Sequence, residues 1–64
     1  MFSKLVKIKL IEKDMTAKEL SEKLGTSQQN LSAKMVRDNF SEKEMLSIAD
    51  ALGFNLKIDF IPKV

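Results

Sequence analysis

The sequence of 64 residues contains neither cysteine nor histidine. These two absences exclude disulfide bonds, thiol chemistry and imidazole acid-base catalysis, together with nearly every transition-metal site. Only carboxylates and lysines remain for catalysis, and no pair of acidic residues stands in an apolar stretch of the kind that raises a carboxyl pKa for acid-base work. We therefore expect no enzyme activity, no bound metal and no cofactor.

Long apolar runs are also missing from the chain. No run approaches the roughly 18 apolar residues of a membrane span, and lysines interrupt the hydrophobic residues of the N-terminal stretch MFSKLVKIKLIEK. Neither a membrane span nor a signal peptide fits this pattern, so the expectation is a cytoplasmic protein without a membrane partner. The net charge of +2 permits a polyanionic partner without requiring one.

The length and composition indicate one small domain covering residues 1–64, with 44% of the residues hydrophobic. No linker, internal repeat or low-complexity segment divides the chain. At this size a hydrophobic core stabilises a fold only marginally, so additional stabilisation by association with a second subunit is expected.

Residues 16–36 predict two short helices joined by a tight turn. Thr16 opens the S/T-x-x-E pattern of a capping box, so a helix is expected to start at Ala17. Gly25 stands where this helix would stop, because glycine enters the left-handed conformation without a Cβ penalty. Ser27 is the next good N-cap. The apolar residues of the two helices lie at helical spacing, namely Leu20, Leu24, Leu31 and Met35.

A further helix is predicted after Ser41, which opens a second capping box, and Gly53 marks its end. The N-terminal segment, residues 2–13, fits two structures. Its apolar residues cover more than half the circumference of a helix, whereas residues 6–10 also alternate with the period of a strand. We favour a helix, because no turn residue interrupts the segment.

The stretch AKELSEKLGTSQQNLSAKM resembles the helix-turn-helix of the lambdoid phage repressor and Cro class, also called the XRE family. In that pattern a small residue lies midway along the first helix, a glycine follows at the turn, and a branched apolar residue lies inside the second helix. Ser21, Gly25 and Leu31 occupy these positions, although alanine is more usual than serine at the first. Lys34 stands where an apolar residue is common, and Met35 is expected to take over its packing role.

This resemblance, which runs from about Leu5 to Gly53, implies a mainly α, compact four-helix domain with its helix-turn-helix at residues 17–36. It also implies a sequence-specific transcriptional regulator that binds double-stranded DNA and represses by covering a palindromic operator. The competing interpretation is a protein-interaction module, such as the antitoxin or adaptor of a small operon, and the surplus hydrophobic residues of segment 2–13 fit it. No small-molecule ligand is expected.

Helical geometry suggests roles for the polar side chains of the second motif helix. If Leu31 and Met35 face the core, a rotation of about 100° per residue turns Gln29 and Ala33 nearly opposite, with Gln28 and Ser32 beside them and Asn30 to one side. Glutamine can pair with N6 and N7 of adenine, serine can donate or accept, and alanine can lie against a thymine methyl. The expected base contacts are Gln28, Gln29, Asn30, Ser32 and Ala33. Without the turn motif, the same residues would indicate only a solvated surface.

Phosphate contacts are expected beside this face, from cations and from the N–H groups at the helix starts. The expected residues are Lys18, Thr26, Ser27, Lys34, Arg37 and Asn39. Residues 41–50 are net negative, so the helix they form is expected to face away from DNA. Phe40 is expected to pack as a core residue at the corner between these two regions.

Residues 55–60 alternate polar and apolar side chains until Pro62, which predicts a single β-strand. A lone strand leaves both edges unpaired and therefore needs a partner. We expect the same strand of a second subunit to pair with it antiparallel, which makes this segment the dimerisation element. The expected dimer-interface residues are Leu56, Ile58 and Phe60.

Overall fold

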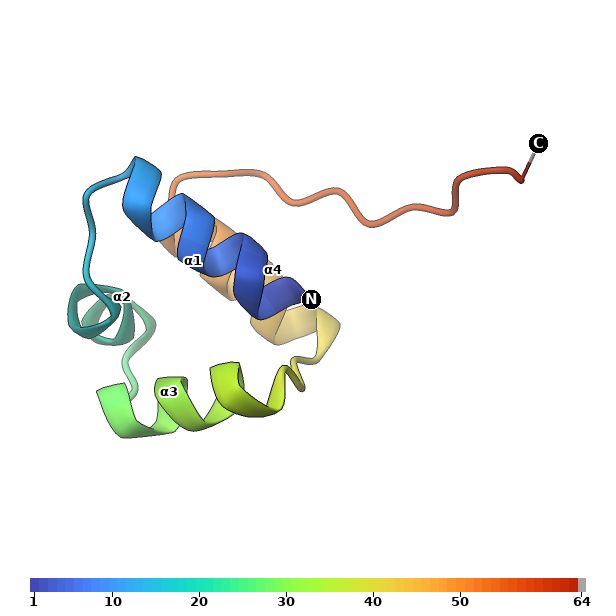
Figure 1. Cartoon of the computed structure of the whole chain (residues 1–64). Helices are drawn as coiled ribbons and strands as arrows, with labels where there is room; N and C mark the ends of the chain where they lie inside the picture. Colours follow the sequence, from blue (N-terminus) through green and yellow to red (C-terminus); the bar gives the residue numbers. More distant parts are fainter. Residues whose placement is uncertain (64) are drawn as a thin grey trace.

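The computed structural model describes residues 1–63 as four helices followed by an extended C-terminal segment (Figure 1). The helices are α1 (Phe2–Glu12), α2 (Ala17–Leu24), α3 (Gln28–Arg37) and α4 (Glu42–Ala51). The mainly α fold with four helices is therefore confirmed. The ambiguous N-terminal segment is helical, as favoured, and its buried residues Ser3, Val6 and Leu10 lie on one helix face.

The helix starts follow the capping signals of the sequence. The Thr16 hydroxyl accepts from the Glu19 backbone N–H at 3.1 Å, and the Glu19 carboxylate accepts from the Thr16 N–H at 3.1 Å. Ser41 forms the same reciprocal pair at the start of α4. Gly25 ends α2 in the left-handed conformation with φ of 72°, as its position predicts.

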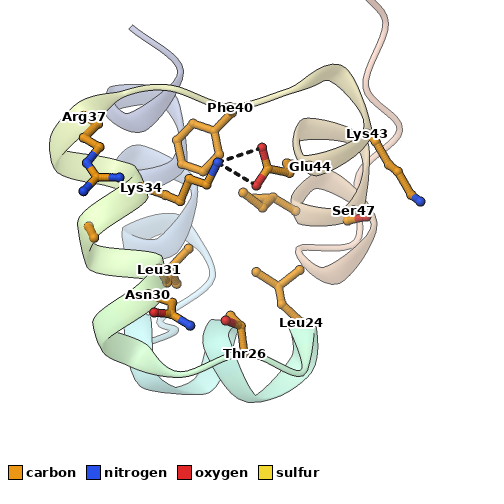
Figure 2. A pocket seen from close by; sticks show the side chains of 12 residues that line it. Leu24, Thr26, Asn30, Leu31, Lys34, Arg37, Phe40, Lys43, Glu44 and Ser47 are labelled. Atoms are coloured by element: carbon orange, nitrogen blue, oxygen red, sulfur yellow. Dashed lines mark hydrogen bonds and ion pairs between the residues drawn. The ribbon is translucent and has the colours of Figure 1, made fainter.

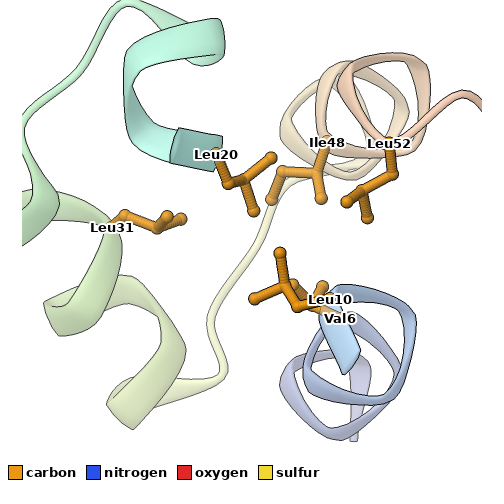
Figure 3. Packing of buried hydrophobic residues seen from close by; sticks show 6 residues of the cluster. All are labelled: Val6, Leu10, Leu20, Leu31, Ile48 and Leu52. Carbon is orange, nitrogen blue, oxygen red and sulfur yellow. The ribbon is translucent and has the colours of Figure 1, made fainter. Parts of the chain in front are cut away.

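The core lies between α1, α2 and α4, and α3 closes it from one side (Figure 3). Its fully or nearly buried members are Val6, Leu10, Leu20, Leu31, Ile48 and Leu52. Phe40 packs against this cluster and meets the Phe2 ring edge to face at 5.2 Å between centroids, which confirms its expected packing role. Met35 is partly buried against the same cluster.

The small residue of the helix-turn-helix pattern, Ser21, is 2% exposed. Its hydroxyl donates to the backbone carbonyl of Lys18 at 2.7 Å, inside its own helix. A buried hydroxyl costs free energy unless it is hydrogen-bonded, and this bond removes the penalty. Serine can therefore replace the usual alanine here without an unsatisfied polar group.

The strand predicted for residues 55–60 is not formed, and residues 54–63 have no regular secondary structure. Alternation assigns side chains to two faces, but a strand also needs a neighbouring strand for its N–H and C=O groups. Residues 1–63 contain no such neighbour. Ile58 and Phe60 are exposed in this single chain, and Leu56 is partly buried.

A link that the sequence did not reveal joins the end of α3 to the start of α1. Asp38 ends α3 in the left-handed conformation, and its carboxylate accepts from the Ser3 backbone N–H at 2.9 Å and from the Ser3 hydroxyl at 3.0 Å. The same hydroxyl donates to the Met35 carbonyl at 2.7 Å, and the amine of Met1 pairs with the Asp38 carboxylate. These bonds fix the direction in which α3 leaves the core.

Replacing Ser3 by alanine is expected to lower the free energy of unfolding by about 1–3 kcal/mol, because the Met35 carbonyl and the Asp38 carboxylate lose their shared donor in a site where Ser3 is only 7% exposed. Urea denaturation measures the change. Ser47→Ala is the matched control, because Ser47 is exposed on α4. Equal midpoints for both variants would show that the Ser3 bonds contribute nothing.

Candidate nucleic-acid interface

The five residues expected to contact bases are all exposed on α3. Leu31, which is 3% exposed, holds this helix against the core, and Ser27 begins it by accepting from the Asn30 backbone N–H at 3.1 Å. The side chains that face away from Leu31 are therefore presented on a helix whose start is capped. In the first two turns of α3 these exposed side chains are either small or amides, namely Gln28, Gln29, Asn30, Ser32 and Ala33.

These residues do not share a single face. Asn30 and Ala33 are among the residues that line a hollow of about 580 Å³ bordered by α3, the end of α2 and α4 (Figure 2). Gln28, Gln29 and Ser32 lie outside its lining. The surface of α3 thus has an outward part with the two glutamines and a part that borders the hollow.

Lys34 is held by α4. Its Nζ lies 3.0 Å from Oε2 and 3.2 Å from Oε1 of Glu44, and it donates to the Asn39 carbonyl at 3.3 Å (Figure 2). The pKa of the Glu44 carboxyl is lowered, first by the backbone N–H of Ser41 and then by the Lys34 amine and the Ser41 hydroxyl. The ion pair of Lys34 and Glu44 bridges α3 to α4. Glu44 therefore already neutralises the charge of Lys34, which was expected to contact a phosphate.

The other expected phosphate contacts are all exposed, namely Lys18, Thr26, Ser27, Arg37 and Asn39. Lys18 lies in the first turn of α2 and Arg37 at the end of α3. Within residues 1–63 neither forms an ion pair, so both charges face solvent. These two cations are placed beside opposite ends of the helix-turn-helix.

The sequence reasoning missed two exposed residues near this surface. Lys43 of α4 lines the same hollow as Arg37, although the acidic composition of residues 41–50 led us to expect that α4 faces away from DNA. Val36 is 87% exposed on α3. Counting rotation from Leu31 would have found it, because five residues at about 100° each place it nearly opposite the core.

Arg37→Ala is expected to weaken binding to every DNA sequence alike and to flatten the slope of log affinity against log salt by about one. The change should be smaller for Lys34→Ala, because Glu44 already neutralises its amine. Salt titrations on two unrelated duplexes measure both slopes. Lys7→Ala, on the exposed side of α1, is the control for loss of one positive charge. An Arg37 variant with the slope of the Lys7 variant would place Arg37 off the DNA.

No helix within residues 1–63 is long and apolar enough to cross a membrane. The same residues contain no group of three or more side chains suited to hold a metal ion.

Comparison with known proteins gave one match. The family model described as the bacteriophage CI repressor helix-turn-helix domain matches residues 3–58, which include all four helices. No curated protein and no solved structure matches the chain. The family match confirms the resemblance to phage repressors seen in the sequence. The chain therefore belongs to the bacteriophage CI repressor helix-turn-helix family, a family of DNA-binding regulators and not of enzymes.

Proposed function

We propose that the protein is a sequence-specific repressor that binds a palindromic operator in double-stranded DNA as a homodimer. The observation that carries this proposal is the row of exposed amide and hydroxyl side chains on α3, the second helix of a repressor-type helix-turn-helix. In this fold the second helix enters the major groove, where base edges offer a distinct pattern of donors and acceptors. Repression follows if the occupied operator overlaps a promoter.

In the proposed complex, amide side chains contact bases and cationic side chains contact phosphates. Gln28 and Gln29 contact base edges, where a glutamine amide matches adenine N6 and N7. Lys18 and Arg37 contact phosphates on either side, which positions α3 without reading sequence. Ser32, Asn30 and Ala33 complete the set that borders the bases. The support for this division is the exposure of all these side chains and the absence of ion pairs of Lys18 and Arg37 within residues 1–63.

The dimer is proposed to form through the C-terminal segment together with the outer side of α1. Ile58 is 55% exposed and Phe60 is 99% exposed, and α1 leaves Leu5 and Ile11 at 54% and 81%. Antiparallel pairing of residues 55–60 across a two-fold axis would give the segment the hydrogen bonds that it lacks alone. It would also bury these apolar side chains and place two copies of α3 at the spacing of about 34 Å that successive major grooves require.

Selection of bound fragments from a random pool of double-stranded DNA tests the function. Enrichment of a palindrome supports a dimeric repressor, whereas enrichment of one unrepeated half-site supports sequence-specific binding by a monomer. A pool that stays random at a salt concentration that weakens non-specific phosphate contacts contradicts the proposal, because the base contacts proposed for α3 would then select nothing.

The second candidate function is a protein-interaction module. Exposure of Leu5, Ile8 and Ile11 on α1 favours it, because together they form an apolar stripe that the fold leaves uncovered. The two functions differ in the surface that matters. Leu5→Ser combined with Ile11→Ser leaves α3 untouched, so loss of function through these changes with dimer assembly and operator binding both intact would favour the interaction module.

A further inference from the structure

α3 carries one large apolar side chain that the fold does not use. Val36 is 87% exposed, whereas Leu31 on the same helix is 3% exposed and Met35 packs against the core. At about 100° per residue, Val36 lies roughly 140° around the helix from Leu31. This direction falls between Gln29 and Ser32, on the outward surface proposed to read bases.

Neither helix formation nor packing accounts for valine at this position. A β-branched side chain loses rotamer freedom in a helix, so alanine, leucine or lysine would favour α3 more. A side chain that stays in water also contributes no free energy of burial to the stability of the fold. Single exposed apolar residues are common on protein surfaces, so exposure alone says little. The position of Val36 among the side chains of the reading surface is what distinguishes it.

We propose that Val36 is a specificity-determining residue that contacts the C5-methyl group of a thymine in the major groove. This proposal rests on the proposed DNA binding and extends it to one further base pair. The thymine methyl is the apolar group that a base edge presents in the major groove, and a valine side chain offers no hydrogen bond to any other base edge. Burying the two groups against each other removes both from water.

Val36 and Ala33 would contact different bases. Val36 is three residues farther along α3, which is a rise of about 4.5 Å along the helix axis. It is also turned by about 60° toward Ser32. Ala33 borders the hollow beside α4, whereas Val36 lies outside its lining. A contact of Ala33 with a thymine methyl would therefore involve a different base from the one proposed for Val36.

Uracil scanning tests the contact directly, because replacing thymine by uracil removes the methyl and keeps the base pair. The probe is the duplex enriched by the selection described above, with each thymine of one half-site replaced in turn. At one position uracil is expected to weaken binding of the unmodified protein about fourfold, the effect of one methyl-sized group at about 0.8 kcal/mol. Val36→Ala should bind the thymine and uracil duplexes at that position equally.

The variant is suited to the test, because alanine is the better helix former and Val36 has no core contact to lose. Gln29→Ala is the matched control on the same surface and should keep the fourfold difference at that position. Leu46→Ala, on α4, controls for loss of an exposed apolar side chain. A Val36→Ala protein that keeps every thymine-to-uracil difference overturns this proposal while leaving the repressor function standing. A protein that enriches no DNA removes both proposals.

Discussion

Gln28→Ala and Gln29→Ala should each weaken binding to the preferred operator by about 1–3 kcal/mol, while affinity for random DNA stays nearly unchanged. A glutamine amide that donates to and accepts from one adenine discriminates against other bases by this amount, and it contributes nothing where the base is wrong. Both side chains are exposed in the first turn of α3, so truncation removes no packing from the fold. Titrations of each variant on the operator and on an unrelated duplex give the two affinities.

The control for this prediction is another exposed amide, which lies in the segment that follows α3. Asn39→Ala removes an exposed amide that is expected to contact a phosphate, so it should weaken binding to both duplexes equally. If the glutamine variants behaved like the Asn39 variant, Gln28 and Gln29 would be positioning contacts and the base readout would lie elsewhere on α3.

The helices could be predicted because the signals that define them are local. Thr16, Ser27 and Ser41 each cap a helix by accepting from a backbone N–H three residues later, and Gly25 adopts the left-handed conformation in the turn. Four or five adjacent residues contain the whole interaction, so its pattern is visible in the sequence. The helical period of Leu31 and Met35 likewise indicated which side of α3 faces the core.

The interactions that set the direction of α3 could not be predicted, because their partners are distant in the chain. Ser3 and Asp38 are separated by 35 positions, and Lys34 and Glu44 by 10. Nothing local marks either pair, since serine, lysine and acidic residues occur throughout the sequence. The phosphate contact expected of Lys34 followed from the helical period alone, which contains no information about the residues that α4 places beside it.

The C-terminal segment illustrates a different limit. Its alternation predicted a strand, but residues 54–63 have no regular secondary structure, because the hydrogen bonds of a strand join two segments and the alternation of one segment contains no information about the other. Val36 was missed for a different reason. Base contacts were sought among Gln28 to Ala33, in the first two turns of α3, and Val36 lies in the last turn.

Ile58→Lys is expected to abolish dimers at micromolar concentration and, with them, tight operator binding. The change places a charge in the apolar face that Leu56, Ile58 and Phe60 are proposed to form between two subunits. A monomer contacts only one half-site, so operator affinity should fall by about a thousandfold or more, toward the non-specific level. Sedimentation by analytical ultracentrifugation measures the assembly, and titration on the full operator and on a single half-site measures the binding.

The chain contains a matched control, Ile61, one position beyond the end of the predicted strand. Ile61 is 90% exposed, but it lies at odd spacing from Ile58 and would point to the opposite face of an extended segment. Ile61→Lys adds the same charge to the same segment and should leave the dimer intact. Truncation after Gly53 retains all four helices and should behave like Ile58→Lys. An unmodified chain that sediments as a monomer would contradict the proposed dimer. A truncated chain that stays dimeric with full operator affinity would assign residues 55–60 another role and leave the outer side of α1 as the surface through which subunits meet.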